Sequence, residues 1–126
     1  MKEMCFTFGS NEAGIHGAGA AAYAYKNRKA VWGVGYGQTG QAFAIPTKDK
    51  QIQTLPLSAV QEYVDRFLDH ARQNPHIEFQ VTRIGCGLAG FTDEEIAPLF
   101  ADAPPNCLFD EAWKPFLPTQ RFWGTF

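Results

Sequence analysis

The sequence predicts a single α/β domain, residues 1–126, in which a mixed sheet carries helices on both faces in three α/β/α layers. Apolar runs of strand length alternate with segments of helical spacing, and this alternation is the first observation behind that class. The second is that two glycine-rich segments each stand between a predicted strand and a predicted helix, where such sheets bind ligands. The third is composition, since 45% hydrophobic and 19% charged residues are typical of a globular chain with a substantial core.

Three strands and one helix are expected in the first part of the chain. Cys5–Phe8 is a short apolar run stopped by a glycine, which is typical of a buried strand. Gly17–Lys29 is rich in alanine and ends in basic residues, as the carboxyl end of a helix prefers. Two more strands are predicted over Ala30–Tyr36 and Gln41–Ile45, with Gly37–Gly40 as the hairpin loop between them.

The clearest helix pattern covers residues 58–73. Ser58 and Gln61 have the spacing of a capping box at its start. Asn74-Pro75 is expected to end the helix, because proline cannot continue it. Apolar residues recur between these ends at helical spacing and would cover one face of the sheet, namely Val60, Val64, Phe67, Leu68 and Ala71.

The rest of the chain is expected to add two strands and a short helix. A strand over Ile77–Ile84 leads directly into the second glycine-rich segment. Thr92 and Glu95 have the spacing of another capping box, which predicts a short helix through Phe100. Asn106–Phe109 is the last predicted strand. The residues after it are too aromatic for a free tail.

Charge and cysteine usage narrow the function classes. The net charge is −2 and the 11 Lys and Arg are scattered, whereas a non-specific nucleic-acid binder carries a basic stripe. Cys5, Cys86 and Cys107 form no CxxC pair, so we expect buried free thiols rather than disulfides or a zinc site. We find no signal peptide and no run that could span a membrane, so we expect a cytoplasmic protein without a membrane partner.

The first glycine-rich segment, Gly9–Ala21, contains four glycines and opens the alanine-rich helix. Small residues let a ligand approach the backbone, and free amides at the amino end of a helix attract an anion. A flexible turn whose small residues allow tight helix packing would have the same composition, so both interpretations stay open. The residues expected to contact a ligand are Gly9, Ser10, Asn11, Gly17, Ala18 and Gly19.

The second glycine-rich segment is Ile84–Phe91, which precedes the helix that Thr92 is expected to cap. It is not a Walker A motif, because no Gly-Lys-Ser/Thr follows, and it lacks the dinucleotide fingerprint. Two such segments in one small domain favour an anionic ligand, and their positions suit a nucleotide diphosphate. The expected contact residues are Gly85, Cys86, Gly87, Leu88, Ala89, Gly90 and Phe91.

Three segments also resemble a known family. Thr82–Leu88 looks like the phosphate loop of macrodomains, especially of the branch that contains the terminal ADP-ribose protein glycohydrolases. Gly17–Ala21 is similar to the other ligand loop of that family, and Ile45–Lys48 resembles the short strand that ends in the branch's catalytic lysine. The order and spacing of the three segments agree with the family over residues 5 to about 109.

The resemblance implies a macrodomain-like fold in which the amides of residues 85–91 hold the diphosphate of ADP-ribose. It also implies that Lys48 faces the C1″ carbon of the distal ribose and that residues 16–19 close over this ribose, without a metal or a cofactor. The branch carries an aspartate directly after Gly-Cys-Gly-Leu, where this chain has Ala89. His16 and Asp93 are the nearest candidates to replace that acid.

Several side chains have more than one interpretation. Lys48 is expected to be a nucleophile, a phosphate ligand or a solvated residue of a charged turn. His16 lies among glycines, so few side chains could shield it. It would donate a hydrogen bond to a phosphate, transfer a proton, or be an exposed loop histidine without a role. Cys86 is either a nucleophile or a small residue beside phosphate, which the resemblance favours. Phe91 would stack on the ligand or join the core, and Asp93 by default stabilises the helix dipole.

The sequence therefore predicts a protein that binds ADP-ribose or an ADP-ribosylated ligand, macromolecules included. Hydrolysis of an ADP-ribosyl linkage, with Lys48 as the catalytic residue, is the activity that the resemblance adds. The alternatives are a reader module that binds the nucleotide without chemistry and a protein-interaction domain that uses the aromatic carboxyl-terminal stretch.

Overall fold

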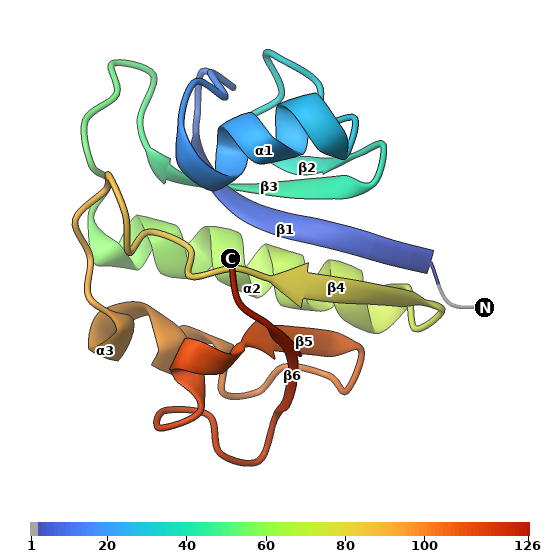
Figure 1. Cartoon of the computed structure of the whole chain (residues 1–126). Coiled ribbons are helices and arrows are strands. Elements are labelled where there is room, and N and C mark those ends of the chain that lie inside the picture. Colours follow the sequence, from blue (N-terminus) through green and yellow to red (C-terminus); the bar gives the residue numbers. More distant parts are fainter. Residues whose placement is uncertain (1–2) are drawn as a thin grey trace.

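The computed structural model describes residues 3–126. Within them the chain forms a mixed α/β domain with three α-helices, as the sequence predicts, and its sheet has six strands where five were expected (Figure 1). The strands are β1 (Glu3–Asn11), β2 (Gly37–Thr39), β3 (Ala42–Lys48), β4 (Ile77–Val81), β5 (Cys107–Asp110) and β6 (Arg121–Gly124). The helices are α1 (Gly19–Asn27), α2 (Leu57–Gln73) and α3 (Asp93–Ile96), with 3₁₀ turns η1 (Ala97–Phe100) and η2 (Glu111–Trp113).

The strand order is β2-β3-β1-β4-β5-β6, and only the β2–β3 pair is antiparallel. The central strand β1 pairs in parallel with β3 on one side and with β4 on the other. Because β1, β3 and β4 run in the same direction, their carboxyl ends meet at one edge of the sheet. Both glycine-rich segments leave the sheet at this edge, one after β1 and one after β4.

Side-chain alternation along β3 divides the core between the two faces of the sheet. Ala42 and Ala44 pack with Phe6, Phe8 and the alanines of α1. Phe43 and Ile45 belong instead to the larger cluster that contains the apolar residues of α2. Since successive side chains of a strand point to opposite faces, α1 and α2 cover opposite faces of the sheet (Figure 1).

The larger cluster is dominated by aromatic rings. The ring of Phe67 on α2 lies 5.0 Å from that of Phe43 and 5.3 Å from that of Phe79. All three are almost completely buried, and burying a phenylalanine side chain stabilises a fold by roughly 1.5–3 kcal/mol. The amphipathic pattern of residues 58–73 is confirmed, because each of its five apolar residues is buried.

No helix within residues 3–126 is long and apolar enough to cross a membrane.

Several predicted boundaries in the first half are wrong. The strand expected over Ala30–Tyr36 is a loop, in which Gly33 has a φ of 95° and donates its amide to the Gly14 carbonyl at 2.8 Å. The hairpin loop expected over Gly37–Gly40 is instead mostly β2, and the turn falls at Gly40 and Gln41. Strand β1 continues through the residues expected to start the first loop.

The two predicted capping boxes have different outcomes. Helix α2 begins at Leu57 with Pro56 as its cap and without a side-chain cap hydrogen bond, so the box at Ser58 is wrong. At α3, the Thr92 hydroxyl accepts from the Glu95 amide and the Glu95 carboxylate accepts from the Thr92 amide, which confirms the second box. The strand expected to reach Ile84 ends at Val81.

The aromatic carboxyl-terminal stretch is part of the fold, as predicted. Trp113 is fully buried, and β6 adds a parallel edge strand beside β5. The last residue, Phe126, donates its amide to the Asp110 carboxylate at 3.1 Å. Its ring lies 5.6 Å from that of Phe6 and 5.3 Å from that of Tyr23, although more than half of the side chain stays exposed.

Candidate functional site

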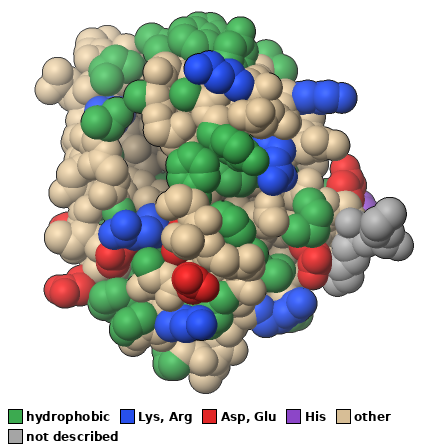
Figure 2. Space-filling view, in the orientation of Figure 1, with side chains coloured by type: hydrophobic (Ala, Val, Ile, Leu, Met, Phe, Trp, Pro, Cys, Tyr) green, Lys and Arg blue, Asp and Glu red, His purple; other side chains and the backbone are tan. Residues whose placement is uncertain are grey.

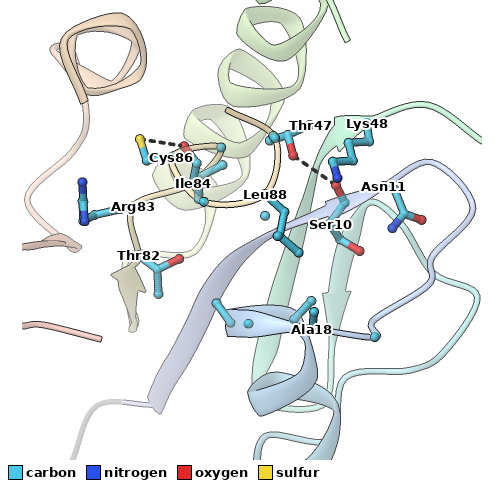
Figure 3. A pocket seen from close by; sticks show the side chains of 18 of the residues that line it. Ser10, Asn11, Ala18, Thr47, Lys48, Thr82, Arg83, Ile84, Cys86 and Leu88 are labelled. Atoms are coloured by element: carbon cyan, nitrogen blue, oxygen red, sulfur yellow. Dashed lines mark hydrogen bonds between the residues drawn. The ribbon is translucent and has the colours of Figure 1, made fainter. Parts of the chain in front are cut away.

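A cavity of about 650 Å³ lies at the carboxyl ends of β1, β3 and β4, between the two glycine-rich segments (Figure 3). Its volume falls in the range of small-molecule sites. The sequence-predicted residues that line it are Gly9, Ser10, Asn11, Gly17, Ala18, Gly19, Lys48, Gly85, Cys86, Gly87, Leu88 and Ala89. Four predicted residues do not line it, namely His16, Gly90, Phe91 and Asp93.

The first segment reaches the cavity through the amino end of α1. Ala18 caps this helix with an extended backbone, no side chain caps it, and its first turn holds no acidic residue. The amides of Gly19, Ala20 and Ala21 have no acceptor within the described residues, and all three residues line the cavity. Uncapped amides at the positive end of the helix dipole form a favourable position for an anion.

The second segment offers a similar set of free amides. Those of Gly87, Leu88 and Ala89 have no acceptor in the part of the chain that the structure describes. The loop is closed by its own backbone, because Gly90 donates to Gly87 at 3.0 Å and Phe91 donates to Gly85 at 2.9 Å. Its Ala89 carbonyl accepts from the Thr54 hydroxyl at 3.0 Å, which joins this loop to the turn after β3.

The three glycines of this loop have different roles. Gly85 and Gly90 have φ values of 77° and 86°, a left-handed conformation that side chains other than glycine rarely adopt. Gly87 has no such φ, and a Cβ atom placed on it would meet no atom within 4 Å. A side chain at Gly87, which lines the cavity, would therefore enter open space and would not clash with the protein.

The charge of the cavity also favours an anion. No carboxylate side chain lines it among the described residues, while Lys48 and Arg83 both do. Arg83 is paired with Asp93, with nitrogen–oxygen distances of 2.9 and 2.7 Å. Lys48 makes no ion pair within residues 3–126. On the molecular face shown in Figure 2, by contrast, Lys and Arg side chains are scattered and form no basic stripe.

Strand pairing sets the position of Lys48. Its residue pairs with Asn11 at an irregular step between β1 and β3, and its carbonyl accepts from the Glu12 amide at 2.9 Å. Figure 3 shows Lys48, Asn11 and Ser10 together at one side of the cavity, with Cys86 and Arg83 at the other. The Asn11 side chain is engaged with the Ile15 backbone, accepting from the amide at 2.9 Å and donating to the carbonyl at 2.8 Å.

The expectation that few side chains could shield His16 is wrong. Its side chain is only 2% exposed, and its ring packs edge-on against Phe8 and Trp32. One ring nitrogen is 2.8 Å from the Ser10 hydroxyl and the other is 2.9 Å from the Val31 carbonyl. Burial lowers the pKa of this imidazole below its ordinary value. His16 thus reaches the cavity only through Ser10.

Asp93 and Phe91 also lie outside the cavity. The Asp93 carboxylate accepts from Arg83 and, at 2.8 Å, from the indole nitrogen of Trp113. The Arg83 guanidinium is the main cause that lowers the pKa of this carboxyl, so Asp93 is held as a structural anion. The Phe91 ring packs against the hydrophobic core beside Gly85. Of the two expectations for this residue, the structure shows packing in the core and not a ring that faces the cavity.

Cys86 lines the cavity as a thiol with little nucleophilic character. Burial, with the nearby Asp93 carboxylate, raises its pKa to about 12. Cys5 and Cys107 are buried free thiols, as predicted. No cluster of His, Cys, Asp and Glu that could hold a metal ion occurs within residues 3–126.

Sequence reasoning missed several residues that line the cavity. Thr47, Thr82 and Arg83 belong to the segments that carry the family resemblance but were not predicted as contact residues, and only the strand order shows that they share an edge. Ile15 and Ile52 add exposed apolar side chains at the rim. Phe126 also lines the cavity, and the only sequence signal for it was the aromatic richness of the last residues.

The chain was compared with protein families, curated proteins and solved structures. No protein-family model, curated protein or solved structure matches the chain.

Proposed function

We propose that this domain binds ADP-ribose, or an ADP-ribosyl group on a macromolecule, in the cavity between the two glycine-rich segments. We further propose that the fold is a three-layer, macrodomain-like one, as the resemblance of residues 82–88, 17–21 and 45–48 implies. One observation carries the proposal: two separate sets of residues that line one cavity have amides without an acceptor in residues 3–126, and no lining residue in that range has a carboxylate side chain.

Unpaired amides on two sides suit a diphosphate better than a single phosphate. The amides of Gly19–Ala21 belong to the start of α1, and those of Gly87–Ala89 belong to the loop after β4. Each set can donate to one phosphate group, and bound phosphate oxygens would satisfy donors that otherwise rely on water. Lys48 adds positive charge at one side, whereas the charge of Arg83 at the other side is paired with Asp93.

The extent of the site fits an elongated nucleotide. Phe126 is anchored to Asp110 on β5, and Lys48 ends β3. The Phe126 ring lies against Phe6, whose partner on β3 is Ala42, six residues before Lys48, and six residues of a strand span about 20 Å. The exposed ring of Phe126 offers a surface on which a base can stack, and Lys48 is available to the opposite end of the ligand.

Lys48 favours hydrolysis of an ADP-ribosyl linkage as a second candidate function. It lines the cavity without an ion-pair partner among the described residues. Neither candidate for the missing acid lines the cavity, because His16 is buried and Asp93 is paired with Arg83. Since a positioned acid or base contributes roughly 10²–10⁴-fold to a rate, we expect turnover to be slow or absent, and a reader of ADP-ribose remains the alternative.

Calorimetric titration with ADP-ribose, ADP and AMP tests the proposed function. We expect ADP-ribose and ADP to bind more tightly than AMP, because only they place a diphosphate across both sets of amides. Binding of none of the three would overturn the proposal. Equal affinity for all three would show that the second set of amides makes no contribution.

A further inference from the structure

A chain of two hydrogen bonds connects the cavity wall, through buried His16, to the loop at Val31. The Ser10 hydroxyl is 2.8 Å from Nδ1 of His16, and Nε2 of His16 is 2.9 Å from the Val31 carbonyl oxygen. Ser10 itself lines the cavity. It stands on the same side of β1 as Phe6 and Phe8, which is the side that α1 covers. The start of α1, with its free amides, also lines the cavity.

The direction of both hydrogen bonds follows from the Val31 carbonyl. A carbonyl oxygen can only accept, so Nε2 of His16 must carry the proton in this bond. Nδ1 of a neutral imidazole is then bare and can only accept. The Ser10 hydroxyl therefore donates its single proton to Nδ1 of His16.

The surroundings of His16 keep it in this state. The side chain is enclosed by the rings of Phe8 and Trp32, and burial disfavours its charged form. The ring cannot turn over without breaking the bond to Val31 as well as the bond to Ser10. The proton of the Ser10 hydroxyl is thus committed, and only its oxygen lone pairs are available to a ligand.

We propose that His16 fixes the Ser10 hydroxyl as a hydrogen-bond acceptor, and that this makes the adjacent cavity wall select a ligand hydroxyl, such as that of a sugar ring, over a phosphate oxygen. The inference rests on the proposed function and names the part of the ligand that this wall receives. A sugar hydroxyl donates to Ser10, whereas a phosphate oxygen has no proton to donate and faces another acceptor. Ser10 would contact the ligand, and His16 would be a positioning residue.

Titration of the full chain with ADP-ribose and with ADP tests this selectivity, because ADP lacks the distal ribose. We expect Ser10→Ala to weaken ADP-ribose about tenfold and ADP less than about twofold, as for one lost hydrogen bond. His16→Phe keeps a ring in the same space but frees the Ser10 proton, which can then turn toward a phosphate. This variant should lower the preference for ADP-ribose over ADP, largely because ADP binds more tightly.

His70→Phe is the matched control. His70 is also partly buried against aromatic rings and bonded to Gln38, but it lies on α2, away from the cavity. This substitution should leave the preference between the two ligands unchanged. If Ser10→Ala weakens both ligands equally, or if the preference is the same in wild type and His16→Phe, the inference is wrong while the proposed function stands. Binding of neither ligand to the wild type would overturn both.

The protonation of His16 gives a test that needs no variant. Nitrogen NMR distinguishes the two neutral tautomers of histidine from the charged form. At pH 7 we expect the His16 signals of a neutral ring with its proton on Nε2. A proton on Nδ1 would mean that Ser10 accepts from His16, and would overturn the inference even if His16→Phe failed to fold.

Discussion

The two glycine-rich segments border the same cavity, but different kinds of contact hold them. In the first segment, side chains fix the loop. The Asn11 side chain makes two hydrogen bonds with the Ile15 backbone, and the buried His16 ring packs against Trp32. In the second, the loop is closed by backbone hydrogen bonds between its own residues, and Leu88 at its tip is 77% exposed. One wall of the cavity is thus part of the folded core, and the other is a loop above it.

This difference separates effects on folding from effects on binding. A change in the first segment disturbs packing that extends to residues 31–35, so stability and affinity should fall together. A change at the exposed tip of the second segment meets little protein, so affinity should fall alone. Substitutions matched between the two segments can test this distinction.

The largest effect on stability is expected from Gly14→Ala. Gly14 has a φ of 72°, and a Cβ atom there would lie 2.2 Å from the Gly33 carbonyl carbon, a backbone atom that cannot move aside. The combined strain and overpacking should lower the free energy of unfolding by about 3 kcal/mol, measured by denaturant titration. Gly17→Ala is the control, since its Cβ atom would meet only Ile15, at 3.9 Å. A small effect at Gly14 would contradict the tight packing of the first segment.

The corresponding change in the second segment is Gly87→Val. A side chain at this position enters open space, so the free energy of unfolding should change by no more than about 0.5 kcal/mol. The same side chain would block the free amides of residues 87–89, and ADP-ribose affinity should fall at least about 100-fold, or ~2.7 kcal/mol. Calorimetry and circular dichroism measure the two quantities, and Gly87→Ala should be intermediate in affinity. Normal binding by the valine variant would reduce this loop to a simple turn.

The sequence predicted the local conformation of the second segment better than the burial of His16 in the first, and the reason is physical. A loop closed by its own backbone is a local structure, so glycine spacing and the Thr92–Glu95 capping box were sufficient to place it. The burial of His16 depends on residues 31–35, which cross over it and were predicted to be a strand. No local pattern could show that Trp32 packs on His16, nor that Gly37–Thr39, expected in a turn, becomes a strand by pairing with β3.

The same limit applies to single site residues. Lys48 lines the cavity, and the signal for it was the Ile45–Lys48 segment, which follows directly on the strand predicted over Gln41–Ile45. Asp93 was expected near the ligand from its distance along the chain, but Arg83 and Trp113 hold it away from the cavity. Phe126 was missed because its ring contacts Phe6 and Tyr23, which lie about 100 residues away in the sequence, and no local pattern predicts such a contact.

A smaller effect on affinity is expected at Lys48, which lies between the two segments. Lys48→Ala should remove any hydrolysis of ADP-ribosylated protein, yet leave the affinity for ADP-ribose within about tenfold, or ~1.4 kcal/mol. The reason is that amides rather than this amine would hold the diphosphate. Lys50→Ala, two residues along on the exposed turn, is the matched control. Full turnover in the Lys48 variant would exclude the lysine mechanism, and complete loss of binding would make Lys48 a phosphate clamp.

The smallest expected effect, a dependence of local stability on pH, separates the two segments without any substitution. Burial lowers the pKa of His16, so the folded protein binds fewer protons than the unfolded chain just below the ordinary histidine value of 6.5. The stability that neutral His16 contributes is complete above pH 6.5 and is lost as the pH falls through the lowered value. The second segment depends instead on Asp93, whose pKa is lowered from 3.8 mainly by Arg83, so its contribution is lost only below that pH.

Between pH 6.5 and 4 the first segment should therefore loosen before the second. Hydrogen exchange, corrected for the intrinsic rate at each pH, should show protection falling at Gly14 and Gly33 while that of Gly90 and Phe91 persists, since all four amides donate to backbone carbonyls. Burial also lowers the pKa of His70, which adds a global loss of stability in the same range. His70→Phe removes this global part, so any difference that remains between the segments belongs to His16. Parallel loss of protection in both segments of that variant would show that the two loops unfold as one unit.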